Sequence, residues 1–199
     1  MSTLVNDEPI PLDFALLGHP DSYQHFGELI IHSRPDYDRA KLEKYQATLT
    51  KMFEWTPSYA AKTPITIYRD NHSTVNGRLV IATFMPDALS NPRQMMMAYK
   101  KTYAGGQLAR DQSARIVGLG GFTSIVGGAQ GEKLANELGV AVTSGNTLTA
   151  ALALAQLNAL LERLGQTLND KPVPIIGASS DIGRACSMAL APQAQRTLL

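Results

Sequence analysis

The sequence is poor in the residues that mark several classes of protein. It has one cysteine, Cys186, so an internal disulfide is excluded. Its cysteine and four histidines show none of the spacings that are typical of a zinc site, and we expect no metal. A single thiol is typical of a reducing compartment, so we expect a cytoplasmic protein.

An excess of charge of one sign is missing as well. Among 199 residues, 18 Lys and Arg stand against 17 Asp and Glu, which gives a formal net charge of +1. Such a balance does not favour nucleic acid as a partner. The start of the chain has no signal-peptide pattern, and the most apolar run, 148–161, is too short to span a bilayer. We therefore expect no transmembrane segment, and we interpret 148–161 as a buried helix.

Segments with strand and helix periodicity alternate along the chain. Apolar runs that are short enough for buried strands lie at 12–17, 115–119, 140–143 and 173–176. Patterns with helical spacing and capping residues lie at 21–33, 38–55, 92–112, 132–138, 148–164 and 182–190. The alternation predicts an α/β fold with a mostly parallel sheet flanked by helices.

A β-hairpin is expected between the second and third helices. Residues 65–68 and 79–84 alternate between apolar and polar side chains. Asn76-Gly77 lies between them and can adopt the positive φ angles of a tight turn. We therefore place the hairpin turn at Asn76-Gly77.

The sharpest local motif is a glycine-rich run between the last predicted strand and helix. Such a turn can hold the pyrophosphate of a dinucleotide against backbone N–H groups and the positive end of a helix dipole. Ser180 stands where a middle glycine is usual, so an ordinary strand–turn–helix joint is the alternative interpretation. The predicted cofactor-binding residues are Gly177, Ala178, Ser179, Ser180, Asp181, Ile182 and Gly183.

Two further runs, 118–126 and 143–150, place glycine and small hydroxyl residues after predicted strands. Ligands of open α/β sheets bind at the carboxyl ends of strands, although simple helix caps would show the same composition. We expect the three runs together to form one crevice. The candidate cleft residues are Gly120, Gly121, Phe122, Ser124, Gly145, Asn146 and Thr147.

Two other side chains receive modest roles. His19 follows Gly18 at a predicted strand end and could line the cleft, but the pattern favours a solvated loop histidine. Cys186 falls one turn into the last predicted helix, where a buried structural thiol is favoured over a reactive one.

The segments, in their order and spacing, resemble the long-chain acyl-ACP reductases, which form fatty aldehydes. The resemblance covers about residues 12–190. It is carried by ALLGHP at 15–20, NGRLV at 76–80, FMP at 84–86, GGFTSIV at 120–126, SGNT with TA at 144–150, and the run at 177–183.

The resemblance implies an organisation and a reaction. Residues 1–11 would be a tail, 12–168 an α/β substrate domain, and 169–199 the start of a truncated NAD(P)-binding Rossmann domain. In this family a cysteine accepts the acyl group from acyl-ACP as a thioester, and NADPH then delivers hydride. That cysteine lies beyond this chain, and Cys186 is not its counterpart. We therefore expect a fragment that is inactive alone.

Two alternatives stay open from the sequence. The chain could be a non-catalytic module that binds an acyl carrier protein or another partner. It could also belong to a related nicotinamide oxidoreductase with a different substrate, because fold analogy cannot choose a substrate.

Overall fold

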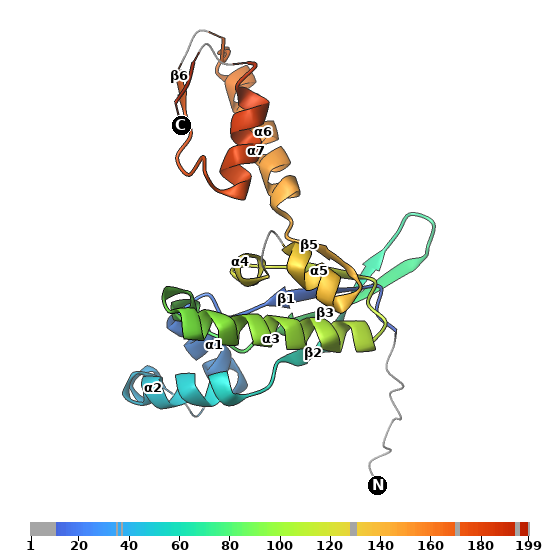
Figure 1. Cartoon of the computed structure of the whole chain (residues 1–199), viewed down its shortest axis with the longest axis vertical. Coiled ribbons are helices and arrows are strands. Elements are labelled where there is room, and N and C mark those ends of the chain that lie inside the picture. Colours follow the sequence, from blue (N-terminus) through green and yellow to red (C-terminus); the bar gives the residue numbers. More distant parts are fainter. Residues whose placement is uncertain are drawn as a thin grey trace. The chain divides into compact units, whose positions relative to one another are not determined.

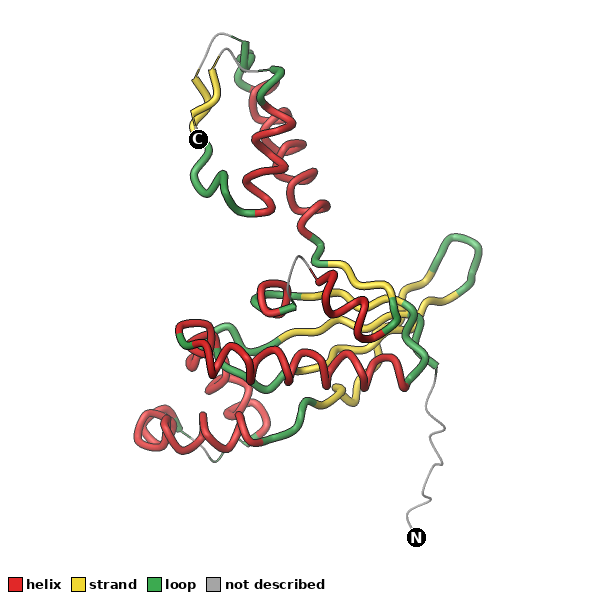
Figure 2. Tube along the Cα trace, in the orientation of Figure 1, coloured by secondary structure: helices red, strands yellow, loops and turns green. Residues whose placement is uncertain are grey.

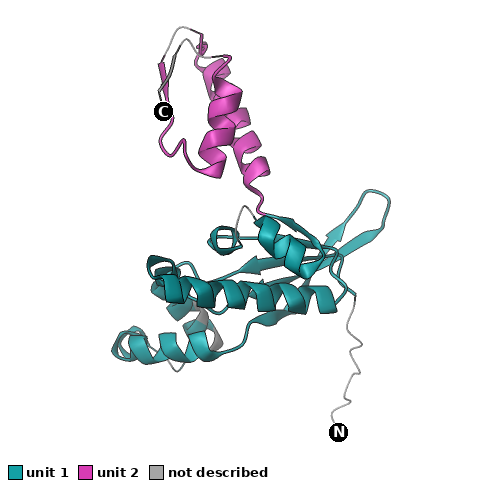
Figure 3. Ribbon diagram, in the orientation of Figure 1, with its two compact units in different colours: residues 1–143 teal, residues 144–199 magenta. Residues whose placement is uncertain are grey.

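A computed structural model describes residues 11–34, 36, 38–127, 131–169, 172–193 and 196–198. Contacts between residues divide the chain into two compact units, Met1–Thr143 and Ser144–Leu199, which are described separately below (Figure 3). Apart from Pro11, the predicted tail lies outside the described residues. No helix within the described ranges is long and apolar enough to cross a membrane.

Unit 1 is built on a five-stranded sheet (Figures 1 and 2). Its strands, in the spatial order β2-β3-β1-β4-β5, are Tyr59–Tyr68, Thr74–Ile81, Phe14–Gly18, Ile116–Leu119 and Ala141–Thr143. β1 pairs in parallel with β3 and β4, β4 pairs in parallel with β5, and β2 pairs antiparallel with β3. The predicted α/β fold with a mostly parallel sheet and one hairpin is confirmed.

The turn of the hairpin was predicted at the wrong place. Arg69 donates its N–H to the carbonyl of Ser73, so the chain reverses before β3. Asn76 and Gly77 lie inside β3, where Gly77 is opposite Phe14 of β1. A Cβ on Gly77 would lie 2.2 Å from the Phe14 ring. The glycine is therefore explained by close packing of an aromatic ring and not by turn geometry.

The predicted helices of unit 1 are present at or near their expected ends. Each of the three longest is capped by a polar side chain: Ser22 accepts from His25 N, Asp38 from Lys41 N and Asn91 from Arg93 N. The helices are α1 (Tyr23–Ser33), α2 (Arg39–Trp55), the 3-10 helix η1 (Pro86–Ser90), α3 (Pro92–Asp111), α4 (Thr123–Val126) and α5 (Glu132–Leu138).

The main core of unit 1 lies between the sheet and helices α3 and α5. Leu17, Val80 and Val117 point from three neighbouring strands toward this side and are almost fully buried. The glycines in the middle of α3 allow the close approach: a Cβ on Gly105 would lie 3.2 Å from Val80, and one on Gly106 would lie 2.4 Å from a methyl carbon of Leu138. The helical cost of this glycine pair is therefore offset by packing.

Unit 2 contains two helices and a two-stranded parallel sheet. α6 (Asn146–Arg163) packs against α7 (Asp181–Leu190), and β6 (Pro172–Pro174) pairs with β7 (Arg196–Leu198). The sequence predicts both helices and the strand at 173–176, so β7 is an addition to the predicted pattern. With α7 between two parallel strands, the segment forms a βαβ arrangement.

Helix α6 is less buried than predicted, and it begins two residues before the predicted 148–164. Of its residues only Ala150 is buried, whereas Leu148 and Leu152 are more than half exposed. The N-cap is Gly145, with a φ of 73°, and not Asn146 or Thr147. Because α6 packs on α7, contacts place it in unit 2, whereas the sequence assigned it to the substrate domain. The functional boundary between 168 and 169 stays a prediction.

Candidate functional site

The carboxyl ends of β1, β3 and β4 meet at one edge of the unit 1 sheet. Gly120 donates its N–H to the carbonyl of Leu17 over 2.8 Å, and Ala82 donates to Gly18 over the same distance. These bonds continue the strand pairing for one step beyond the strands. The segments that follow the three strands are therefore held side by side at the edge where α/β sheets bind their ligands.

His19 occupies the centre of this edge and is buried, with only 8% of its surface exposed. Its ring stacks on Phe84, which follows β3, and on Phe122, which follows β4. The ring centroids are 4.7 Å and 5.4 Å from that of His19. The interpretation of His19 as a solvated loop histidine was therefore wrong. No local pattern in the sequence indicated that Phe84 and Phe122 would stack on it.

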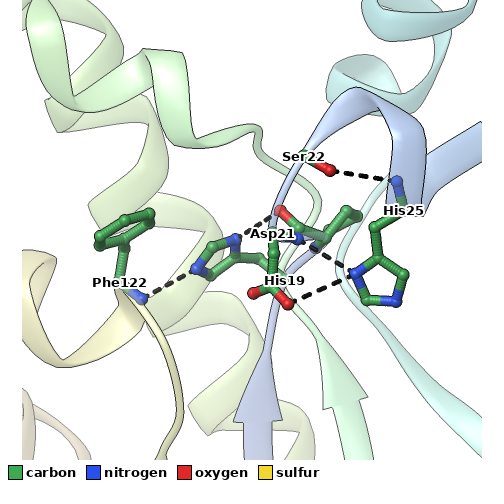
Figure 4. A network of polar contacts seen from close by, with 6 residues as sticks. His19, Asp21, Ser22, His25 and Phe122 are labelled. Atoms are coloured by element: carbon green, nitrogen blue, oxygen red, sulfur yellow. Dashed lines mark hydrogen bonds and ion pairs between the residues drawn. The ribbon is translucent and has the colours of Figure 1, made fainter.

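Both ring nitrogens of His19 have partners (Figure 4). Nδ1 lies 2.8 Å from the carbonyl oxygen of Pro20. The backbone N–H of Phe122 donates to Nε2, also over 2.8 Å. Burial lowers the pKa of His19 below its ordinary value, and this effect exceeds the opposing influence of the Pro20 carbonyl. The arrangement favours a neutral imidazole.

The predicted cleft residues after β4 form a compact turn. Gly121 has a φ of 56°, and a Cβ there would lie 2.8 Å from Nε2 of His19. The Thr123 hydroxyl donates to the Gly120 carbonyl over 2.7 Å, and the Ser124 hydroxyl donates to the Gly121 carbonyl over 2.9 Å. The Phe122 side chain is 38% exposed at this edge. The hydroxyl groups thus shape the turn.

The glycine-rich run of unit 2 forms the expected strand-to-helix turn. Gly177 has a φ of 80°, and its carbonyl accepts from the hydroxyl of Ser180 over 2.8 Å. Ser180 caps α7, because its hydroxyl oxygen accepts from Gly183 N–H over 3.1 Å. A Cβ on Gly183 would lie 2.0 Å from the Gly177 carbonyl oxygen. Only glycine at 183 allows the helix to begin this close to the turn.

An open hollow of about 710 Å³ lies beside this turn. Among the described residues of its lining, Arg184 alone carries a charge. The hollow is lined by Pro174, Ile175, Ile176, Gly177, Ala178, Ser179 and Arg184. A guanidinium group is suited to phosphate oxygens, and the turn leads directly into the start of α7, so these residues could hold the phosphates of a dinucleotide. Arg184 was not among the predicted cofactor-binding residues, although it directly follows Gly183.

Within unit 2, the predicted segment 143–150 contacts the glycine-rich run 177–183. Asn146 Nδ2 donates to Asp181 Oδ2 over 3.2 Å, which ties the start of α6 to the start of α7. The Thr149 hydroxyl donates to the Gly145 carbonyl and completes the first turn of α6. The segment 120–126 belongs to unit 1, and the single crevice expected from all three runs stays a prediction.

Cys186 lies in α7 with a half-buried side chain. No thiol partner exists elsewhere in the sequence. This position gives no support to a reactive role, and the structural role stays a prediction.

Curated proteins with a similar sequence include the two described here. The chain is 30% identical over 180 residues to the long-chain acyl-[acyl-carrier-protein] reductase of Synechococcus elongatus, an alignment that covers 86% of this chain and 50% of the relative. It is 41% identical over 83 residues to the aminotransferase PigE of a Serratia species, covering 42% of this chain and 10% of that protein. The chain thus spans about half the length of the first relative. No family model matches.

Proposed function

We propose that this chain is part of a nicotinamide-dependent reductase that converts a long-chain acyl thioester, as carried by acyl-ACP, to a fatty aldehyde. The observation that carries the proposal is the 30% identity to a long-chain acyl-ACP reductase along 86% of the chain. The α/β architecture and the glycine-rich turn of unit 2 agree with this assignment. A cytoplasmic location is part of the proposal.

In this proposal the turn of unit 2 holds the cofactor, for which we favour NADPH. The cofactor-binding residues are those predicted, Gly177 to Gly183, and Arg184 would pair with a phosphate group. When bound, NADPH supplies the hydride that reduces a thioester carbonyl, and the thiol then leaves with a proton. The chain's own contribution is a fixed turn that places the pyrophosphate at the start of α7.

The segment after β4 is the proposed contact for the acyl thioester. Gly120 and Gly121 leave the backbone accessible there, and the ring of Phe122 offers an apolar surface. Ser124 belongs to the same turn. Cys186 receives no nucleophilic role, because it is half-buried in α7. We place the cysteine that forms the acyl thioester outside these 199 residues.

A titration of the full chain with NADPH and with NADH tests the cofactor part of the proposal. We expect saturable binding of NADPH that is tighter than that of NADH and that is lost in Gly183→Ala, because the added Cβ meets backbone at 2.0 Å. Gly139→Ala is the matched control, since its added Cβ has no neighbour within 4 Å and it lies in unit 1. No NADPH binding at millimolar concentration would refute a cofactor site in this chain.

One observation favours the alternative of a non-catalytic carrier-binding module. The Ser180 hydroxyl already accepts from Gly183 N–H, so one backbone donor near the proposed pyrophosphate site is in use. A parallel titration with acyl-ACP separates the two functions. Binding of acyl-ACP without NADPH supports the module, whereas binding of both supports the reductase.

A further inference from the structure

The hydrogen bonds of His19 define one form of its ring. A carbonyl oxygen can only accept, so Nδ1, at 2.8 Å from the Pro20 carbonyl, carries a proton. The N–H of Phe122 can only donate, so Nε2 is unprotonated. The contacts therefore select the neutral tautomer with its proton on Nδ1. Both nitrogens are engaged, which leaves neither free to exchange a proton with a substrate.

The packing around His19 leaves little room for another arrangement. Its ring stacks on the rings of Phe84 and Phe122, with interplanar angles of 27° and 17°. Gly121 approaches so closely that a Cβ there would lie 2.8 Å from Nε2. One imidazole therefore joins the segments after β1, β3 and β4.

We propose that His19 is a positioning residue that holds the segment 120–124 at the carboxyl edge of the sheet only while its ring is neutral. A proton on Nε2 would replace the acceptor with a donor that faces the N–H of Phe122. Two opposed donors in a buried site cannot stay in contact, so the segment is released. The link to catalysis rests on the proposed function, because it requires that 120–124 lines the substrate cleft.

Burial and the charged groups near His19 determine the pH at which the segment 120–124 is released. Burial has the largest influence and lowers its pKa; the Pro20 hydrogen bond and Asp21 raise the pKa, and His25 lowers it. Asp21 precedes α1 and His25 lies in the first turn of α1, with 3.5 Å between Asp21 Oδ2 and His25 Nδ1. The segments after β3 and β4 contribute the neutral groups Phe84 and Phe122 to this contact. Release is therefore expected only at a pH below 6.5, the ordinary pKa of histidine.

Nuclear magnetic resonance of the full chain, labelled with ¹⁵N and free of ligand, tests the proposal. Two-bond proton–nitrogen correlations at pH 7.5 should show His19 with its proton on Nδ1. On acidification to pH 5, the exchange protection of the Phe122 amide should fall by roughly tenfold, the loss expected for one hydrogen bond. The amide of Ala109, which is buried in α3, should keep its protection and exclude global unfolding.

Two substitutions separate the hydrogen bond from the bulk of the ring. His19→Gln keeps an acceptor near the position of Nε2 and does not titrate, so Phe122 should stay protected at both pH values. His19→Asn reaches only the position of Nδ1, and we expect protection to be lost at both. His25→Gln is the matched control, because it removes the neighbouring histidine and should leave the acid response of Phe122 in place.

The outcomes distinguish this inference from the proposed function. The inference about His19 is overturned if its ring carries a proton on Nε2 at pH 7.5. It is also overturned if the exchange protection of the Phe122 amide is the same at pH 7.5 and pH 5. These measurements on the wild-type chain decide the question even if the variants do not fold. Because no nucleotide or carrier protein is present, failure of the reductase proposal would leave the result on His19 unchanged.

Discussion

Each unit contains a glycine-rich segment that leads from a parallel strand into a helix, but the two segments are stabilised differently. In unit 1, Gly121 has a φ of 56° and the turn is joined to His19, which lies 103 positions from its partner Phe122. In unit 2, Gly177 has a φ of 80° and the turn is closed by Ser180, three residues away. The turn of unit 1 therefore depends on a contact between distant segments, whereas the turn of unit 2 is stabilised mainly by neighbouring residues.

The largest expected effect separates these two modes. His19→Ala removes a buried ring and leaves the Phe122 N–H without its acceptor, so unit 1 should lose about 3 kcal/mol of stability. Hydrogen exchange measured by mass spectrometry should show faster exchange in peptides from 14–22 and 116–126. Peptides from 172–190 serve as the internal control. Equal acceleration in both units would contradict the comparison.

Gly183→Ala makes the corresponding change in unit 2. The Cβ would meet the Gly177 carbonyl oxygen at 2.0 Å, and because this neighbour is backbone we expect a loss of about 2 kcal/mol for unit 2. Gly165→Ala is the control: its φ is 60° and nothing lies within 4 Å of the added Cβ. It should cost about 1 kcal/mol through backbone strain alone. Similar losses in the two variants would show that steric contact does not set the turn.

Acid should weaken unit 1 before unit 2. Burial lowers the pKa of His19 in the folded chain below its model-peptide value of 6.5, so the unfolded chain binds more protons between these two pKa values. The stability that unit 1 gains from keeping His19 neutral is therefore complete above pH 6.5. It is lost as the pH falls toward the pKa of His19 in the folded chain. The slope is at most about 1.4 kcal/mol per pH unit for one proton. Urea unfolding between pH 7.5 and 5 measures how the free energy of unfolding changes with pH in the wild type and in His19→Gln. Equal pH dependence in the two proteins would contradict the prediction, because it would mean that His19 stays neutral throughout.

The smallest effects concern hydroxyl groups. Ser180→Ala removes the cap of α7 and should cost about 1 kcal/mol. Ser124→Ala removes a bond to the Gly121 carbonyl from an exposed turn that His19 still holds, so we expect about 0.5 kcal/mol. Thermal unfolding of each variant provides the measurement. A larger loss for Ser124→Ala than for Ser180→Ala would reverse the proposed difference between the units.

Local signals in the sequence were reliable where one stretch of chain contains all the partners. The caps Ser22, Asp38 and Asn91 and the turn that ends at Ser180 each involve residues within a few positions of one another. At Asn76-Gly77 a local turn signal was misleading, because Gly77 is explained by its contact with the distant Phe14. The burial of His19 likewise depends on residues far away in the sequence and was not predicted.

The alternation of strands and helices, the mostly parallel sheet and the glycine turn of unit 2 could be predicted from residue patterns, because periodicity and capping act over a few residues. Three features depend on contacts between distant segments: Gly77 faces an aromatic ring, β7 pairs in parallel with β6, and the ring of His19 stacks on Phe84 and Phe122. The order of strands in the sheet sets these contacts, and that order depends on which distant segments pack together. Local residue patterns in a single sequence do not show which distant segments pack together.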